Sequence, residues 1–506
     1  MSSDGHEPTA MTFELLKTAV KDGGARLGRL AFPGRRTVDT PNFFGLTSRG
    51  VVPHVTPDNV EKHLLTNGTY MALEDFIERP QQYMTRSPPV YETPSPNNKP
   101  LQSFTAMPSS IITVLGSRRL PAVAAPMGNT NQSISVFTST GFQAITTKQY
   151  INAIQTLNPD IAIPLADLTH KTSAPTSKRA LRMAERTDDW IKEWFMDMYG
   201  RNKEPSKIAT FAPVLPISYS IQWEYLERLS EEHQSNPSVL SGLAVYDADL
   251  IPDISSSYQS LDTLPRLALT TPSNPHQVLR QLSLGMDIFL LPFLSTASDA
   301  GIALSFTLPP PSSESSELLP LGIDMSSSEH AISLQPLTES CTCYACTTHH
   351  RAFVQHLLCA REMLGWTLLQ IHNHAVLASF FASIREALAD GTFEEKARQF
   401  ALRYEPEIPQ GLGERPRARG YHFKSEGPGE QKRNRPAWSK FEDEKKIEDK
   451  VADLSIADLS IADEQNGTSG LGSGVDSVAE TPLVPDETAD ANDLEEMGFA
   501  EKVENK

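Results

Sequence analysis

Three of the chain's four cysteines lie within six residues, in the run Cys341-Thr-Cys343-Tyr-Ala-Cys346. Three thiols at this spacing do not fit on one face of a regular helix or strand, so they suit a tight turn around a soft cation. Zinc accepts three thiolates and one imidazole in a tetrahedron, with bonds of ~2.3 Å to sulfur and ~2.0 Å to nitrogen. The concentration of cysteines therefore favours a metal site over incidental free thiols.

A histidine further along the chain is expected to complete this site. Thr348–Ala389 reads as one long amphipathic helix, which can bring His372 back to the cysteines after a spacer of twenty-five residues. On spacing alone His374 remains an alternative to His372. Four protein ligands leave no position for water, so the predicted zinc ion, one per chain, is structural rather than catalytic.

The number of cysteines, the first residues of the chain and the length of its apolar runs indicate the cellular compartment in which the protein is expected. Cys359 lies among apolar residues of the predicted helix, so we expect a small buried hydrophobic side chain and not a ligand. Few cysteines at metal-binding spacing indicate a reducing compartment. The first residues lack an apolar signal segment, and apolar runs such as Ile288–Leu294 are far shorter than the ~20 residues of a membrane span. We expect a soluble, cytoplasmic protein with no integral membrane segment.

The acidic net charge of -18 does not exclude a nucleic-acid partner, because the charge is unevenly placed. Residues 451–506 hold fourteen acidic side chains against two lysines, a net charge of -12. A basic stretch that can meet phosphate precedes them, although a solvated linker is the favoured interpretation. Its cationic residues are Arg415, Arg417, Arg419, Lys424, Lys432, Arg433 and Arg435.

Short apolar runs alternate with amphipathic segments through the first 300 residues. Ser133–Thr138, Ile161–Leu165, Ile208–Leu215, Leu240–Tyr246, Arg266–Thr271 and Met286–Leu291 read as strands, whereas Lys148–Leu157, Lys178–Tyr199, Ile221–Glu232 and Pro275–Leu284 read as helices. Such repeated strand–helix–strand units predict a parallel sheet. Because no glycine-rich nucleotide-binding loop is present, we expect an α/β fold of the (β/α)₈ TIM-barrel type and not a doubly wound sheet.

Composition divides the chain into five parts. We expect an N-terminal extension at 1–25, the barrel at 26–308, a Pro/Ser-rich connector at 309–336, a zinc-binding helical subdomain at 337–400 and a disordered acidic tail at 425–506. Within the barrel, Glu78–Ser110 holds seven prolines and predicts a long loop. The tail is too poor in apolar residues to offset the entropy of ordering.

These motifs together resemble the tRNA-guanine transglycosylases. Cys341, Cys343 and Cys346, followed after twenty-five residues by His372-Asn373, reproduce the family's zinc pattern, and this resemblance implies His372 and not His374 as the fourth ligand. Barrel motifs of the family are similar to Thr40-Pro41-Asn42-Phe43, Gly141-Phe142-Gln143, Ser241-Gly242-Leu243-Ala244-Val245 and Leu284-Gly285-Met286-Asp287-Ile288-Phe289. The resemblance covers roughly residues 26–389 and implies a barrel with a structural zinc.

The chain departs from the family where the chemistry is done. By the resemblance, catalytic members use one aspartate as the nucleophile on ribose C1′ and a second aspartate as general acid/base, and both roles require a carboxylate. The nucleophile position here is Leu290, and the acid/base position is Thr138. The Arg-rich loop after the nucleophile is replaced by Phe293–Ser298. These three losses predict that the chain has no catalytic residues of its own.

Asp167 is the remaining candidate for the family's base-recognising carboxylate. Its surroundings, Pro164-Leu165-Ala166-Asp167-Leu168-Thr169, match the family poorly. A strand-end aspartate that caps the next helix is therefore favoured over retained base binding. The alternative function, a self-sufficient transglycosylase that uses a non-standard carboxylate, depends on this residue. A zinc hydrolase or deaminase is disfavoured because four ligands saturate the metal and no deaminase signature is present.

The resemblance implies a non-catalytic subunit that pairs with a catalytic homologue. The pair would exchange guanine for queuine at wobble position 34 of tRNAs with GUN anticodons, and peripheral association with the mitochondrial outer membrane rests on the resemblance alone. The predicted helix 348–389 carries more apolar side chains than one barrel flank needs, which favours a partner. These side chains are Phe353, Leu357, Leu364, Trp366, Leu368, Phe380 and Phe381.

Overall fold

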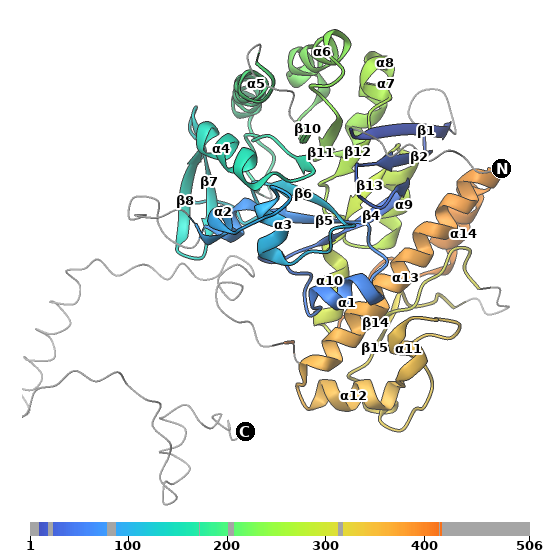
Figure 1. Ribbon diagram of the computed structural model, residues 1–506. Coiled ribbons are helices and arrows are strands. Elements are labelled where there is room, and N and C mark those ends of the chain that lie inside the picture. The colour runs from blue at the N-terminus through green and yellow to red at the C-terminus, as the bar shows by residue number, and fades with distance from the viewer. Residues whose placement is uncertain are drawn as a thin grey trace, which may run out of the picture. The chain divides into compact units, whose positions relative to one another are not determined.

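The computed structural model describes seven stretches of the chain: 10–18, 24–77, 88–171, 173–200, 207–311, 317–413 and 415–416 (Figure 1). The chain divides into the units Met1–Glu430 and Gln431–Lys506, and every described residue lies in the first unit. The predicted acidic tail and most of the basic stretch before it lie outside the described residues.

Eight parallel strands form a closed barrel, as the alternating sequence pattern predicts. The last strand pairs with the first, Ile288 beside Asn42, which closes the ring. In order around the barrel the strands are β4 (Asn42–Leu46), β5 (Gly68–Ala72), β6 (Ile112–Gly116), β9 (Ile161–Ala162), β10 (Ala209–Val214), β11 (Gly242–Val245), β12 (Arg266–Ala268) and β13 (Ile288–Leu290).

Helices follow the strands and lie outside the barrel (Figure 1). Their starts follow from local sequence: Thr146 and Gln149 form a reciprocal capping box, and Asn274 caps a helix whose first residue is Pro275. The barrel helices are α1 (Pro57–His63), α2 (Pro89–Glu92), α3 (Pro100–Thr105), α4 (Thr147–Leu157), α5 (Ser177–Tyr199), α6 (Tyr219–Ser235), α7 (Ile251–Ser257), α8 (Gln259–Asp262), α9 (Pro275–Ser283) and α10 (Pro292–Asp299). Helices α2 and α3 lie within the segment 78–110 that the sequence predicts as a loop.

Large aromatic side chains fill the barrel interior and need glycine on neighbouring strands. A Cβ at Gly68 would lie 2.6 Å from the ring of Phe44, and a Cβ at Gly242 would lie 2.6 Å from the ring of Phe211. Real carbon atoms do not approach this closely, so each glycine makes room for a ring. The interior is therefore a packed core, as in other barrels of this type.

An antiparallel sheet of three strands, β1 (Thr12–Thr18), β2 (Arg26–Ala31) and β3 (Val38–Thr40), precedes the barrel. Strands β2 and β3 thus lie outside the closed barrel, although the span expected for the barrel begins at residue 26. The Arg26 guanidinium forms two hydrogen bonds to Asp287, at 2.9 and 2.6 Å, directly before β13. This buried ion pair fixes the sheet at the amino-terminal end of the barrel and uses the Asp287 carboxylate structurally.

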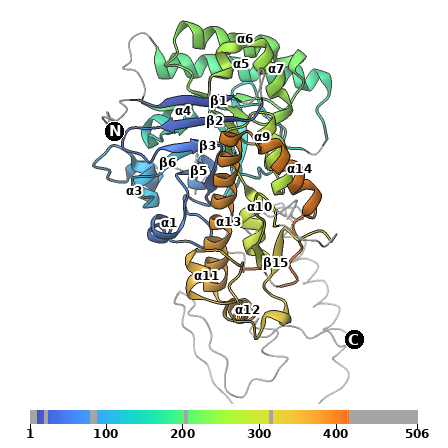
Figure 2. The same cartoon turned by 90° about the vertical axis from the view of Figure 1, so that its right-hand side faces the viewer.

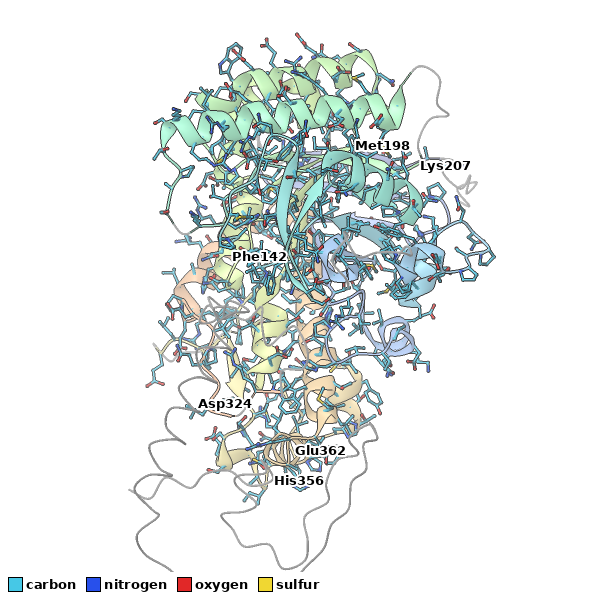
Figure 3. The ribbon with its side chains drawn as sticks, turned by 90° about the vertical axis from the view of Figure 1, so that its left-hand side faces the viewer. Phe142, Met198, Lys207, Asp324, His356 and Glu362 are labelled. Carbon is cyan, nitrogen blue, oxygen red and sulfur yellow. The ribbon has the colours of Figure 1, made fainter. Side chains whose placement is uncertain are left out.

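The predicted strand Ser133–Thr138 forms as β7, but it is not part of the barrel. It pairs antiparallel with β8 (Gly141–Thr146) in a hairpin, on which Figure 3 labels Phe142. Gly141 at the turn has φ of 105°, which only glycine adopts readily. The Glu74 carboxylate, from the short helix η1 (Leu73–Phe76), accepts the backbone N–H groups of Arg119 and Phe137, both at 2.8 Å. These bonds hold the hairpin against the barrel.

The region after α10 consists of a small hairpin and a helical part. Its elements are β14 (Ile302–Leu304), β15 (Gly322–Asp324), the short helix η4 (Ser328–His330), α11 (Tyr344–Thr348), α12 (Arg351–Cys359), α13 (Met363–Asp390) and α14 (Phe393–Arg403). Strand β15 and η4 lie in the segment that the sequence assigns to the connector. Figure 2 shows α13 running from the side of α11 and α12 along the barrel towards β2 and α14, and it contacts both the barrel strand β4 and α12.

The prediction of one continuous helix over Thr348–Ala389 is wrong at two points. His349 and His350 are extended, and the His350 Nδ1 atom caps α12 by accepting the Phe353 backbone N–H at 3.2 Å. A second interruption separates α12 from α13, where Arg361 has φ of 57°. Neither interruption contains the glycine or proline that ordinarily marks a helix end, so the sequence pattern did not reveal them.

The expected surplus of exposed apolar side chains on this helical region is also absent. Trp366, Leu368, Phe380 and Phe381 are buried in the chain's own cores, and Leu364 is exposed over 46% of its surface. The helical periodicity identified apolar faces correctly, but the barrel and α12 cover them. Apolar exposure on α13 therefore gives no argument for a partner.

Candidate functional site

The structure brings the three clustered cysteines and His372 together. The four ligand atoms lie within 4.8 Å of one another. The distances from His372 Nδ1 to the sulfur atoms are 3.7 Å for Cys341, 3.7 Å for Cys343 and 3.3 Å for Cys346. Zinc bonds of ~2.3 and ~2.0 Å at tetrahedral angles place sulfur and nitrogen about 3.5 Å apart. The donor set and its spacing therefore fit one tetrahedral metal ion.

Hydrogen bonds orient His372 towards the sulfur atoms. Its Nε2 atom lies 2.9 Å from the Leu304 carbonyl oxygen and 3.2 Å from Thr338 Oγ1. Because a carbonyl oxygen only accepts, Nε2 carries the proton and the Nδ1 lone pair is free to bind a metal. A metal-bound histidine is ordinarily fixed by such a second bond. Strand β14 thus sets the tautomer of His372.

Asn373 fastens α13 to the same strand. Its Oδ1 atom accepts the Leu304 backbone N–H at 2.8 Å, while Nδ2 donates to Ser298 Oγ at 2.9 Å and to the Ile302 carbonyl at 3.0 Å. The side chain is fully buried, so these bonds replace water completely. His372 therefore faces the cysteines, whereas the adjacent Asn373 joins α13 to β14.

Replacing Asn373 by alanine is expected to lower the free energy of unfolding by about 2–3 kcal/mol, because three buried polar groups lose their partner. Asn152→Ala is the matched control: Asn152 is exposed on α4, and we expect it to change stability by no more than about 0.5 kcal/mol. Urea titration of both variants measures the difference. Equal stability of the two variants would contradict the role given to Asn373.

The other two candidates near the cluster lie elsewhere. His374 is fully buried beside Phe43, with ring centroids 5.7 Å apart, and is not among the four clustered ligands. Burial lowers the pKa of His374 to about 3, so its ring is neutral. Cys359 is exposed at the end of α12, so the expectation that it is buried is wrong. The expectation that it is not a ligand agrees with the geometry.

Leu290 ends β13 at the carboxyl end of the barrel, where active sites of this fold lie. It is fully buried in the same apolar cluster as Phe44 and Phe211. An alkyl side chain offers neither a lone pair for attack nor a proton for transfer. The end of β13 can therefore pack the barrel but cannot supply a nucleophile.

Thr138 lies at the end of β7, and its hydroxyl is occupied within the hairpin turn. Its Oγ1 atom donates to the Gly141 carbonyl at 2.8 Å and lies 3.3 Å from the Thr140 backbone nitrogen that donates to it. These bonds close the turn between the two strands. The hydroxyl has no acidity near neutral pH, so it cannot replace a carboxylate that gives and takes a proton.

Asp167 is the one carboxylate that the sequence left as a candidate, and two arginines hold it. Arg179 donates to both carboxylate oxygens at 2.5 and 2.6 Å, and Arg186 donates at 3.1 Å. Asn129 Nδ2 adds a bond of 2.7 Å. Burial alone would raise the pKa of Asp167, but the hydrogen bonds from Arg179, Asn129 and Arg186 keep it below its usual value. The carboxylate is thus a fixed anion with its acceptor positions in use.

Sequence reasoning missed the residues that surround Asp167. Arg179 and Arg186 are seven residues apart on α5 and therefore lie on one helix face, a spacing visible in the sequence. Asn129 comes from the loop after β6, and the pairing of β6 with β9 brings this loop beside Asp167. The seven-residue spacing of the two arginines could therefore have been recognised in the sequence, whereas no sequence pattern pointed to Asn129.

None of the helices in the described part of the chain has the length and apolar character of a membrane span.

Comparison with known proteins agrees with this geometry. Residues 21–406 match the family model described as queuine tRNA-ribosyltransferase. The chain is 33% identical to a "Queuine tRNA-ribosyltransferase accessory subunit 2" of Schizosaccharomyces pombe, over 82% of this chain and 89% of the relative. It is 25% identical to the protein of the same name from Xenopus laevis (74% and 96%) and 24% identical to that from Drosophila mojavensis (74% and 88%). By its barrel, its Cys₃His cluster and these matches, the chain belongs to the queuine tRNA-ribosyltransferase family.

Proposed function

We propose that the chain is the non-catalytic subunit of a heterodimeric queuine tRNA-ribosyltransferase. In this assembly a catalytic homologue exchanges guanine for queuine at wobble position 34 of tRNAs with GUN anticodons. Membership of the family supports a role in tRNA modification. The names of the relatives, which call them accessory subunits, support a partner that performs the chemistry.

The observation that carries this proposal is the state of three residues, Leu290, Thr138 and Asp167. The nucleophile position is the buried alkyl side chain of Leu290, and the acid/base position is Thr138, whose hydroxyl closes a turn. The remaining carboxylate, Asp167, is held by two arginines. Base exchange through a glycosyl-enzyme intermediate needs one anionic nucleophile and one group that moves a proton. The chain therefore depends on another subunit for both.

The proposed metal is zinc, held by Cys341, Cys343, Cys346 and His372. Hydrogen bonds from Cys341 and Cys343, and the nearby His372, lower the pKa of the Cys346 thiol, which favours the thiolate that a metal binds. Four ligands leave no site for substrate, so the ion's contribution is to tie the turn at 341–346 to α13. This tie supports the short helices α11 and α12, which would be marginal by themselves.

A self-sufficient transglycosylase that uses Asp167 is the second candidate, and the contacts of Asp167 oppose it. Attack on ribose would require the carboxylate to leave Arg179 and Arg186, which donate three hydrogen bonds to it. Cytoplasmic location stays a prediction that rests on the metal-spaced thiols, and association with the mitochondrial outer membrane stays a prediction from the family alone.

Mixing the purified chain with the catalytic homologue of its own organism is expected to give a 1:1 complex at micromolar concentrations. Sedimentation velocity measures this, since the complex has about twice the mass of either subunit. The control is the same chain with an unrelated barrel protein, which should sediment as separate species. If the chain and the homologue sediment independently at micromolar concentrations, the accessory-subunit proposal is wrong.

A further inference from the structure

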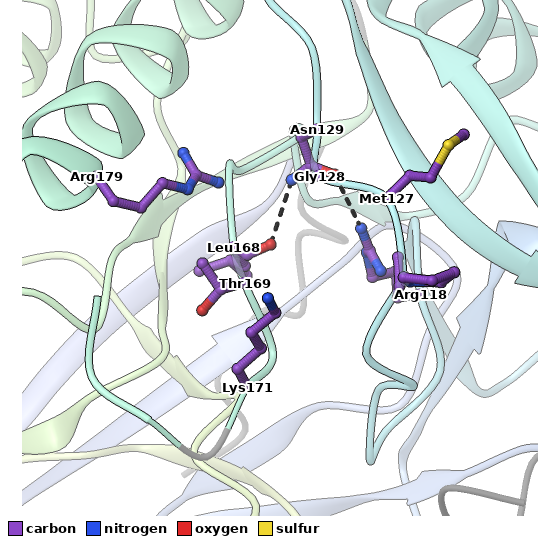
Figure 4. A pocket seen from close by; sticks show the side chains of 10 residues that line it. Arg118, Met127, Gly128, Asn129, Leu168, Thr169, Lys171 and Arg179 are labelled. Atoms are coloured by element: carbon purple, nitrogen blue, oxygen red, sulfur yellow. Dashed lines mark hydrogen bonds between the residues drawn. The ribbon is translucent and has the colours of Figure 1, made fainter. Parts of the chain in front are cut away.

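The loops that follow β6 and β9 enclose a small cavity at the carboxyl end of the barrel. These two strands are adjacent and parallel, so their loops meet at one side of the mouth. The cavity measures about 90 Å³. Figure 4 shows side chains reaching it from both loops and from α5. The lining includes three cationic residues, two polar residues and one leucine: Arg118, Lys171, Arg179, Asn129, Thr169 and Leu168.

Arg118 is the least satisfied charged group of this cavity. Its side chain is only 8% exposed, and its one hydrogen bond is a long contact of 3.4 Å from Nη2 to Asn129 Oδ1. No carboxylate of the described residues forms an ion pair with it. The carboxylates of Glu74 and Asp167 act on Arg118 only from a distance, and a buried guanidinium without a direct ion pair is costly. An anion in the cavity would provide the missing partner.

The surroundings leave positive charge uncompensated. Arg118, Lys171 and Arg179 all line the cavity, and none of its lining residues is acidic. The nearby carboxylate of Asp167 is neutralised by Arg179 and Arg186. Lys171 is exposed and forms no hydrogen bond or ion pair with any residue that the structure describes. The cavity therefore presents a buried guanidinium and an exposed ammonium group to one small space.

The neighbouring histidine does not alter this balance. His170 lies directly before Lys171, and its Nε2 atom is buried without a hydrogen-bond partner. Burial, together with the charge of Arg118, lowers the pKa of His170 to about 3. The ring is therefore neutral at physiological pH, and it adds a polar atom but no counter-charge.

We propose that this cavity binds a phosphate group. A guanidinium matches two oxygens of a tetrahedral oxyanion in a bidentate way, and a lysine ammonium adds a point charge. A volume of about 90 Å³ exceeds the roughly 10–15 Å³ that one water needs, so the cavity has room for a single tetrahedral anion. The phosphate can belong to a free phosphate ester or to the backbone of a bound RNA. The inference concerns this cavity alone and does not depend on the accessory-subunit proposal.

Titration calorimetry of the full chain with inorganic phosphate tests the site. We expect one phosphate per chain and an affinity that falls about tenfold or more in Arg118→Gln, because a charge-assisted bidentate contact is lost. Lys171→Gln is expected to weaken binding severalfold, and it cannot disturb folding because its side chain is exposed and unpaired. Arg398→Gln is the control, since Arg398 is exposed on α14 and Glu395 is its one ion-pair partner among the described residues.

Two further ligands identify the source of the phosphate. If a free ester is bound, a nucleoside 5′-monophosphate binds as inorganic phosphate does, and an oligoribonucleotide without terminal phosphates does not compete. If RNA supplies the group, that oligoribonucleotide competes with phosphate, and Arg118→Gln weakens its binding. The proposal is wrong if inorganic phosphate gives no heat at millimolar concentration, or if Arg398→Gln weakens binding as much as Lys171→Gln does.

Discussion

Replacing Cys343 by serine is expected to release the bound metal and to loosen residues 337–359. The intact chain should hold about one zinc ion, and the variant much less, because a serine hydroxyl is a poor substitute for a thiolate. Zinc binding contributes about 10–16 kcal/mol in small zinc-binding peptides, and in such sites binding and folding are coupled. The loss of stability in Cys343→Ser should therefore exceed the loss caused by removing any single hydrogen bond.

The unfolding should be local. Helices α11 and α12 are short, with five and nine residues, and their core is the small cluster around Trp366 and Leu357. Helix α13 is anchored independently, since Phe381 packs on Phe43 of the barrel with centroids 5.5 Å apart. Hydrogen exchange should show α11 and α12 opening in the variant while the second half of α13 stays protected.

Cys359→Ser is the matched control for this experiment. Cys359 is exposed and lies outside the cluster, so this variant should keep the metal and its melting temperature. Metal analysis by mass spectrometry and a thermal melt measure both variants. Full zinc content and unchanged melting in Cys343→Ser would contradict the ligand set.

The barrel could be predicted from the sequence because the pattern of apolar strands and amphipathic helices is local and recurs along the chain. Each predicted strand from Ile161 onwards contains a barrel strand, since apolar runs between amphipathic helices have few other arrangements. The strand at Ser133–Thr138 shows the limit of this reasoning. Its apolar pattern gives the strand but not its partner, and the partner is the next strand and not the barrel.

The metal cluster could also be predicted, because ligand type and spacing are written in the sequence. What could not be predicted is the environment of single residues. From the sequence, Asp167 is expected to cap the next helix, yet the residue that caps α5 is Thr176. The Asp167 carboxylate is held instead from two places along the chain, by Asn129 of one loop and by Arg179 and Arg186 of α5. Arg361 interrupts a long helical pattern with no glycine or proline to mark the break. Both features depend on tertiary packing and not on local sequence.

The purified chain is expected to exchange no labelled guanine into tRNA by itself. Both catalytic steps need a carboxylate, and the resemblance to catalytic members of the family predicts Leu290 and Thr138 at the positions concerned. Leu290→Asp alone should not restore activity, because Thr138 still leaves the proton-transfer role empty. That variant would also place a carboxylate in the apolar barrel interior, which costs several kcal/mol and raises the pKa of the new group.

Base exchange with radiolabelled guanine, measured with the chain alone, with the catalytic homologue alone and with both together, tests the central claim most directly. The tRNA carries a GUN anticodon in all three reactions, and a tRNA with a different wobble base is the substrate control. We expect no incorporation by the chain alone and a rate with both subunits well above that of the homologue alone. Robust exchange by this chain alone, or no gain from adding it to its homologue, would contradict the account.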